Sequence, residues 1–311
     1  MTTQETLAGC SWHSYPKIYN VGHAYLSEFF ANGAEITAEE KVDGSQFSFG
    51  VFGGELRIRS RGQKLHVEAP EKMFVKGVET AKALAPVLRD GWTYSGEFLG
   101  SAKHNSLTYG RVPEKHIILF EIRTGHEEYL GYDDKAEEAE RLGLEIVPRI
   151  YTGPVTSPVE LDALLDRESV LGVAKIEGVV LKRSELLCGP DGKALIAKYV
   201  SPHFREIHTK EWRKSNPTSS DGIGELAESL RTDARWHKAV QHLKESGELT
   251  GTHADIAKLF KEVQSDVWAE CYELITETLV NHAKPRINRV VSSGLAEWYK
   301  ALLAEGAFPT K

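Results

Sequence analysis

The sequence is short of cysteine and of long apolar runs, and each shortage excludes a class of protein. Its 311 residues contain three cysteines, at positions 10, 188 and 271. Cysteines this few and this far apart exclude a disulfide framework or a cysteine-rich zinc cluster and predict reduced thiols. No apolar run reaches the length of a membrane helix, and the first residues lack the basic and apolar segments of a secretory signal. We therefore expect a cytoplasmic protein without a membrane partner.

Positive charge is also scarce, since 38 Lys and Arg face 45 Asp and Glu and the formal net charge is −7. This balance argues against a protein that coats nucleic acid by bulk charge. A protein that grips a few phosphates remains compatible with it, provided that Lys and Arg cluster locally. The 12 histidines show no metal-ligand spacing along the sequence.

Two kinds of pattern divide the chain. Up to about residue 210, short alternating runs predict strands and longer periodic runs predict helices. The expected strands are residues 35–41, 46–52, 55–60, 92–98, 116–122, 144–150, 178–181 and 194–200, and the expected helices are 71–88, 134–142 and 158–165. After a polar, turn-rich stretch the pattern is helical only, and Pro285 is expected to end a long amphipathic helix. The predicted organisation is a domain of residues 1–212, a linker of 213–222 and an all-helical domain of 223–311, hence an α+β fold with antiparallel sheets followed by helices.

The segment Glu40-Lys41-Val42-Asp43-Gly44 is the most informative in the chain. It places a lysine just before an Asp-Gly turn, at the junction of two predicted strands. A lysine held there can act as a nucleophile if its pKa is lowered. The motif alone is weak, because an exposed lysine at a surface turn gives the same pattern.

Five further motifs follow in order. Arg59 and Arg61 lie in a cationic cluster, which serves either as a phosphate grip or as the charged edge of a hairpin. Gly96-Glu97-Phe98 sets a carboxylate at a strand end beside a glycine that permits close approach of a ligand. The remaining motifs are Leu119-Phe120-Glu121, Glu177-Gly178-Val179-Val180-Leu181-Lys182 and Ile196-Ala197-Lys198. Lysines and carboxylates on apolar strands are costly unless paired, so we expect several of them to line one pocket.

This ordered series resembles the covalent nucleotidyltransferase superfamily of ATP-dependent ligases and capping enzymes, and within it the phage RNA ligase 2 type. The resemblance by motif covers residues from about 15 to 205. It implies an ATP-grasp-like adenylylation domain in which Lys41 becomes covalently adenylylated. It also implies that Glu97 contacts the ribose and that Phe120 stacks on adenine.

The same resemblance implies roles for the later motifs. Glu177 would help to hold a metal ion near the α-phosphate, and Lys198 would contact that phosphate and assist the departure of pyrophosphate. Arg149 resembles a family arginine between the aromatic and Glu-Gly motifs. Either Arg59 or Arg61 resembles the cation that follows the nucleophile strand, and the sequence leaves both open.

Two departures from the family pattern are visible. The final motif often reads Lys-x-Lys, whereas Val200 follows Lys198-Tyr199 here, so Lys182 is a candidate for the second phosphate contact. An arginine often precedes the nucleophile, whereas Glu39 and Glu40 occupy that stretch here.

The resemblance predicts an ATP-dependent RNA ligase that uses Mg²⁺, with Mn²⁺ as an alternative. Its partner would be RNA with 5′-phosphate and 3′-hydroxyl ends, including a nicked duplex, and we expect a monomer. The helical C-terminal region favours an RNA ligase, because DNA ligases and capping enzymes of the superfamily usually append a small β-barrel. The alternatives are a DNA ligase, a capping-type guanylyltransferase, or an inactive nucleic-acid-binding relative.

Overall fold

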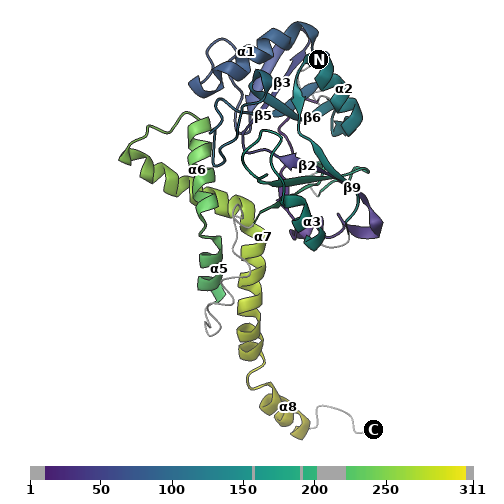
Figure 1. Cartoon of the computed structure of the whole chain (residues 1–311). Coiled ribbons are helices and arrows are strands. Elements are labelled where there is room, and N and C mark those ends of the chain that lie inside the picture. The colour runs from purple at the N-terminus through teal and green to yellow at the C-terminus, as the bar shows by residue number, and fades with distance from the viewer. Residues whose placement is uncertain (1–10, 156–157, 190–191, 202–221, 306–311) are drawn as a thin grey trace, which may run out of the picture. The chain divides into compact units, whose positions relative to one another are not determined.

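The computed structural model describes residues 11–155, 158–189, 192–201 and 222–305 (Figure 1). The chain forms two compact units: residues 1–205 with 240–255, and residues 206–239 with 256–311. The expected linker, 213–222, lies outside the described residues except for Gly222. The sequence-based domain limits therefore stay a prediction.

The first unit contains two sheets whose neighbouring strands are mostly antiparallel. The nucleophile sheet has the order β1-β11-β10-β2-β9, with only the β1–β11 pair parallel. Its strands are β1 (Ile18–Asn20), β2 (Glu35–Lys41), β9 (Arg149–Pro154), β10 (Gly178–Arg183) and β11 (Ile196–Val200).

The aromatic sheet has the order β4-β3-β5-β6-β7, and β8 pairs in parallel with β6. Its strands are β3 (Ser45–Phe52), β4 (Glu55–Ser60), β5 (Thr93–Phe98), β6 (Ile117–Gly125), β7 (Glu128–Tyr129) and β8 (Glu145–Ile146).

Helices cover these sheets, as Figure 1 shows for α1 (Val75–Leu84) and α2 (Tyr132–Leu142) beside the aromatic sheet and α3 (Pro158–Leu165) beside the nucleophile sheet. Successive residues of a strand face opposite sides, so Phe47 and Phe49 of β3 enter the core under α1 while Ser48 faces the other way. A second core lies between the nucleophile sheet and α3, around Val179 and Leu161. Each sheet therefore buries one face and leaves polar side chains on the other.

Most sequence-based element predictions are confirmed, with shifted ends. The helix expected at 71–88 is α1 flanked by 3-10 turns at Lys72–Phe74 and Ala85–Val87. Pro86 lies in the second turn and has no N–H to continue the α-helical ladder. The helix expected from residue 134 begins at Tyr132, and it ends where Gly143 adopts a φ of +61°.

The single strand expected at 144–150 is wrong, because this stretch supplies both β8 and β9. β8 joins the aromatic sheet through β6, and β9 joins the nucleophile sheet through β2. Pro148 lies between them and cannot donate to a ladder, but its carbonyl accepts the N–H of Glu40 at 3.1 Å. The chain therefore crosses between the two sheets at this proline.

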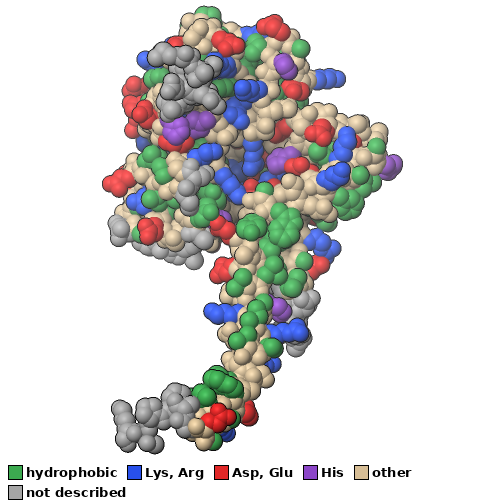
Figure 2. Space-filling model, turned by 180° about the vertical axis from the view of Figure 1, so that it is seen from behind, with side chains coloured by type: hydrophobic (Ala, Val, Ile, Leu, Met, Phe, Trp, Pro, Cys, Tyr) green, Lys and Arg blue, Asp and Glu red, His purple; other side chains and the backbone are tan. Residues whose placement is uncertain are grey.

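The helices of the second unit are α5 (Gly222–Leu230), the first half of α6 (Asp233–Glu245), α7 (Ile256–Val291) and α8 (Leu295–Ala304). α5 packs on α7 through Leu230, Cys271 and Ile275. Asp266 of α7 pairs with the buried Arg235 and accepts from Lys238 Nζ at 2.7 Å. Figure 2 shows hydrophobic side chains exposed along the long helix. The exposed hydrophobic residues of α7 include Phe260, Trp268 and Tyr272. None of the helices in the described ranges is long and apolar enough to cross a membrane.

The prediction that Pro285 ends the long helix is wrong, since α7 continues to Val291. A proline removes one N–H, which would have bonded to the carbonyl four residues earlier. That residue, Asn281, is exposed, as is Pro285 itself, so water can take the freed carbonyl.

The aromatic core predicts a large cost for truncating Phe47. Its ring is fully buried and lies about 6 Å from the rings of Phe49, Phe74 and Phe98. We expect Phe47→Ala to lower the free energy of unfolding by about 3–5 kcal/mol, because the surroundings of a buried ring collapse only partly. Urea unfolding checks this, with Val87→Ala, half-exposed in the same unit, as the control. Equal effects of the two substitutions would contradict the assignment of this core.

Candidate active site

The turn between β2 and β3 holds Lys41 at the end of β2 and is anchored by the segment 105–109. Asp43 Oδ2 accepts the backbone N–H groups of Ser106 and Leu107 at 2.8 and 2.7 Å, and the Asp43 N–H donates to the Tyr109 hydroxyl at 2.7 Å. Gly44 leaves little room for a side chain, because a Cβ there would lie 3.0 Å from Glu97, Leu99 and Phe98. A larger residue at this position would therefore push on the strand end that carries Glu97.

Lys41 forms an ion pair with Glu177, and their Nζ and Oε2 atoms are 2.5 Å apart. β2 pairs with β10 so that Lys41 lies opposite Gly178, the residue after Glu177. Burial alone would lower the pKa of Lys41, but the charge and hydrogen bond of Glu177 outweigh it and the pKa is raised. The protein's own side chains thus keep Lys41 as an ammonium ion. Nucleophilic attack requires a lower pKa of Lys41. A cation, or a group that arrives with the substrate, has to supply that lowering.

Lys198 and Asp43 act on the same carboxylate. Burial raises the pKa of Glu177, Lys41 and Lys198 oppose the rise, and Asp43 adds to it. Lys198 lies on β11, where it pairs with Val180 of β10 and Asn20 of β1. The structure therefore brings Lys41, Glu177 and Lys198 into one electrostatic group.

Glu97 on β5 joins this group from the aromatic sheet. Burial raises the pKa of Glu97 to about 8, Lys41 opposes the rise, and Glu245 and Glu177 add to it. Its neighbour Gly96 is held by close packing, since a Cβ there would lie 2.6 Å from the Ile118 carbonyl oxygen. At neutral pH the Glu97 carboxyl is therefore mostly protonated, and it can donate a hydrogen bond as well as accept one.

Gln241 and Glu245, on the half of α6 that belongs to the first unit, were missed by sequence reasoning. Gln241 Nε2 donates at 2.9 Å both to the Gly44 carbonyl oxygen and to Glu245 Oε1. Glu245 is buried and close enough to Glu97 to affect its pKa. No motif marks these residues, and only tertiary packing brings them to a turn almost 200 positions earlier.

Phe120 on β6 is partly buried and has a Tyr15 ring against it. The two ring centroids are 5.1 Å apart in an edge-to-face arrangement, and the Tyr15 hydroxyl donates to Glu121 Oε2 at 3.2 Å. Tyr15 precedes β1, so the N-terminal segment reaches the residue that the resemblance assigned to adenine stacking.

A buried ion cluster lies beneath Phe120. Lys135 of α2 and Lys182 of β10 both donate to Glu39, at 2.8 and 2.9 Å, and Lys182 also pairs with Glu121 at 2.9 Å. Both ammonium groups donate to the Phe120 carbonyl oxygen, at 2.9 and 2.8 Å. The cluster satisfies two buried acids and fixes the backbone of Phe120.

Lys182, the sequence-based candidate for a second phosphate contact, lies in this ion cluster. Lys182 pairs with Thr37, four residues along β2 from Lys41, or roughly 13 Å at about 3.3 Å per residue. Burial lowers the pKa of Lys182, but Glu121 and Glu39 outweigh it and the pKa is raised. Glu39, which stands where the family often has arginine, is one of its partners.

Arg59 lies near the end of β4, Arg61 just after that strand, and Arg149 at the start of β9. Burial and Arg123 lower the pKa of the partly buried Arg59, whose Nε donates to the Ser60 carbonyl oxygen at 3.4 Å. Arg61 is exposed just after β4. The guanidinium of Arg149 pairs with Asp133 at 3.2 Å and lies 4.5 Å from the centroid of the Tyr132 ring, on α2. Their predicted nucleotide contacts stay predictions.

The ion cluster predicts a large loss of stability when one partner is removed. We expect Lys182→Met to lower the free energy of unfolding by about 3–5 kcal/mol, because it leaves buried Glu39 and Glu121 with fewer partners. The matched control is Lys82→Met, which removes the exposed pair with Glu68 and is expected to cost less than about 1 kcal/mol. Urea unfolding of both variants decides the matter, and a Lys182→Met effect as small as that of the control would contradict a buried cluster.

The raised pKa of Glu97 predicts a specific pH dependence. A carboxyl group with a folded-state pKa of about 8 and an unfolded pKa of about 4.3 loses its stabilising contribution as pH rises through that interval. Glu97→Gln removes this loss, so its unfolding free energy relative to the native protein is expected to increase by more than about 1 kcal/mol between pH 5 and pH 9. Urea unfolding at both pH values measures it, with the exposed Glu79→Gln as control. A difference that does not change with pH would refute the shift.

Solved structures of a Naegleria gruberi RNA ligase are similar to this chain, each at 18% sequence identity. An apo variant has a TM-score of 0.47 and a pyrophosphate complex a TM-score of 0.47, and the matches cover 63% and 67% of this chain and 58% and 59% of the ligase. A variant with ATP and manganese has a TM-score of 0.46, and the match covers 64% of this chain and 59% of the ligase. This chain thus spans less than two thirds of their length. No curated protein sequence matches it. The model of the RNA ligase family matches residues 34–200, more than half of the chain and from the start of β2 to the end of β11, so the protein belongs to the RNA ligase family.

Proposed function

We propose that the protein is an ATP-dependent RNA ligase that forms a covalent lysyl-AMP on Lys41, transfers AMP to an RNA 5′-phosphate and joins that end to a 3′-hydroxyl. The observation that carries the proposal is the contact between Lys41 and Glu177, with Glu97 and Lys198 acting on the same pair. Family membership supports the reaction class. Among the described residues that follow β11 the secondary structure is helical, which favours an RNA ligase over relatives that append a β-barrel.

The residues present fit a hard divalent cation at this position. Three carboxyl groups lie close enough to Lys41 and to one another to shift pKa values, namely those of Glu177, Glu97 and Asp43. Carboxyl oxygens are ligands that suit Mg²⁺ and Mn²⁺. Glu177 is the residue that would hold the ion, which would offset phosphate charge there. A cation that competes for Glu177 also weakens the pair that keeps Lys41 protonated.

The first step forms a bond between Lys41 Nζ and the α-phosphorus of ATP and breaks the bond from that phosphorus to the bridging oxygen of pyrophosphate. The ammonium group must first lose a proton, and the Glu177 carboxylate at 2.5 Å is the nearest base. Lys198 supplies positive charge as the phosphorus gains a ligand and pyrophosphate leaves.

The nucleoside end of ATP would lie against the aromatic sheet. Phe120, whose backbone is fixed by Lys135 and Lys182, offers its ring for stacking. The mostly protonated Glu97 can bond a ribose hydroxyl as donor or acceptor. In the second step the lysyl-AMP phosphorus is attacked by an RNA 5′-phosphate and Lys41 leaves. In the third step a 3′-hydroxyl displaces AMP.

The nucleophile assignment predicts that Lys41→Ala abolishes transfer of label from α-labelled ATP to the protein, because it removes the amine proposed to form the phosphoramidate. Lys41→Arg is expected to fail as well, since it keeps the charge but cannot lose its proton at neutral pH. Lys82→Ala, exposed on α1, serves as the matched control and should label normally. Gel analysis after incubation with magnesium measures the label, and a labelled Lys41→Ala protein would show that the nucleophile lies elsewhere.

Two tests on the native protein identify the substrate class. Labelling with GTP in place of ATP distinguishes a capping-type enzyme. Sealing of nicked duplexes with RNA or DNA on the 3′-hydroxyl side distinguishes an RNA ligase from a DNA ligase. We expect labelling by ATP and sealing when RNA supplies the 3′-hydroxyl. Preference for GTP, or sealing of DNA alone, would refute the proposed substrate. The narrower likeness to the phage RNA ligase 2 type stays a prediction.

A further inference from the structure

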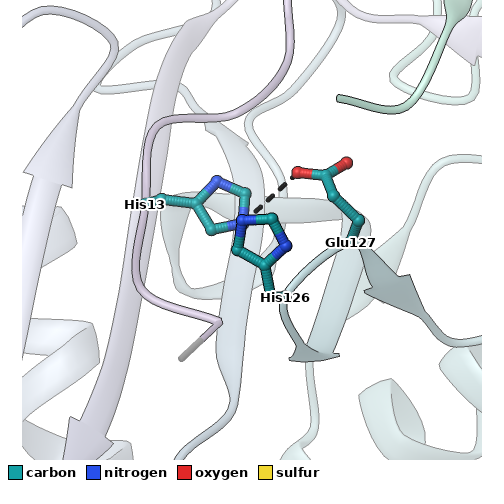
Figure 3. A group of neighbouring side chains, drawn as sticks. All are labelled: His13, His126 and Glu127. Carbon is teal, nitrogen blue, oxygen red and sulfur yellow. Dashed lines mark ion pairs between the residues drawn. The ribbon is translucent and has the colours of Figure 1, made fainter. Parts of the chain in front are cut away.

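Three side chains with metal-binding atoms converge where the N-terminal segment meets the β6–β7 hairpin. His13 comes from the segment before β1, and His126 and Glu127 form the turn between β6 and β7. One ligand atom from each lies within 4.8 Å of the others. Figure 3 shows the two imidazole rings next to each other with the Glu127 carboxylate directed at them. These residues are distinct from the group around Lys41.

His13 presents one ring nitrogen to the backbone and the other to Glu127. Its Nδ1 lies 3.0 Å from the Ser14 carbonyl oxygen. Nε2 is 3.4 Å from Glu127 Oε1. A ligating histidine typically bonds its other nitrogen to a carbonyl in this way.

Glu127 has one carboxylate oxygen anchored and one without a partner. Oε2 accepts from the Tyr129 hydroxyl and from the Ala194 N–H, both at 2.7 Å. Oε1 is buried and has no hydrogen-bond partner, although the side chain is only 7% exposed. The residue also adopts a φ of +52°, a conformation costly for a side chain other than glycine. A strained backbone thus holds a buried carboxylate oxygen that no donor satisfies, which calls for a cation.

Arg123 is the neighbouring charge that a metal ion would have to tolerate. Its Nη1 lies 2.8 and 3.1 Å from the two ring nitrogens of His13. A metal ion bound at Nε2 would therefore displace Nη1 from that nitrogen. Burial lowers the pKa of Arg123 while Glu127 and Glu121 act in the opposite direction, so two carboxylates already offset the guanidinium charge.

We propose that His13, His126 and Glu127 form a binding site for a zinc-class transition metal ion. Two imidazoles and one carboxylate are the donor set of three-residue zinc sites, with a fourth position for water. Mg²⁺ prefers oxygen ligands alone, so the site is expected to select against the ion used with ATP. His126 is exposed, which gives the ion access from solvent.

The ion would fasten the N-terminal segment to the catalytic domain. Tyr15 follows His13 by two residues and packs on Phe120, so a metal at His13 would restrain the ring that covers the expected adenine platform. Glu127 is bonded to Ala194, between β10 and β11, so the same ion would link three separate parts of the chain. This inference does not depend on the proposed ligase reaction.

The full-length protein, stripped with a chelator and dialysed, tests the site by titration with Co²⁺ and with Zn²⁺. We expect one Co²⁺ per chain with the visible absorption of a four-coordinate site. Zn²⁺ at about 100 times its dissociation constant is expected to raise the melting temperature by about 5 °C. His126→Ala, an exposed substitution, should weaken Co²⁺ binding at least about tenfold, and Glu127→Gln likewise. His66→Ala, an exposed histidine elsewhere on the same unit, should bind as the native protein does.

Three results would overturn the proposal. The first is a native protein that shows no stoichiometric Co²⁺ band and no melting shift with Zn²⁺. The second is native-like binding by His126→Ala and Glu127→Gln, which would place the metal at other ligands. The third is displacement of Co²⁺ by an equal concentration of Mg²⁺, which would refute a nitrogen-containing site. Because His126 lies on the surface, circular dichroism of its variant separates loss of a ligand from loss of the fold.

Discussion

The antiparallel register of β2 and β10 is the constraint on which the candidate site depends. It sets Lys41 opposite Gly178 and thereby brings the ammonium group onto the Glu177 carboxylate. Gly178 also allows β10 to pack closely on β11, because a Cβ there would lie 2.4 Å from the Tyr199 carbonyl oxygen. Lys198 reaches the same carboxylate only because β11 follows β10 in the sheet. A slip of one residue would turn every side chain of the strand to the other face.

β2 also carries a second electrostatic centre on the same face as its lysine. Glu39 and Lys41 are two residues apart and so point to the same side of the sheet, while Glu40 points away and accepts from Ser169 and Val170. Glu39 holds Lys135 and Lys182 under Phe120, and Lys41 holds Glu177. One strand thus organises both the expected nucleophile and the support of the expected base-stacking ring. Glu39 is the acid on which this support depends.

Much of the fold and site could be read from local pattern. The bounds of β2, β4 and α3 agree with the expected strands and helix because alternation and capping are properties of neighbouring residues. The prediction of one strand at residues 144–150 was wrong, because this apolar run contributes strands to two sheets, one on each side of Pro148. Gln241 and Glu245 could not be found, since an ordinary helical sequence does not reveal what the helix packs against. The same holds for His13 and the hairpin at Glu127, which are over 100 residues apart and share no ligand spacing.

The sequence by itself determined the strand and helix types, the order of the nucleotidyltransferase motifs and the identity of the groups that can do the chemistry, because these depend on residue type and short-range periodicity. Only the tertiary structure decided that Lys41 is protonated by its pairing with Glu177, that Lys182 belongs to a buried cluster, and that Glu97 is mostly neutral. Protonation states and partners depend on burial and on charges within a few ångströms, and those distances arise when strands far apart in the chain are brought side by side.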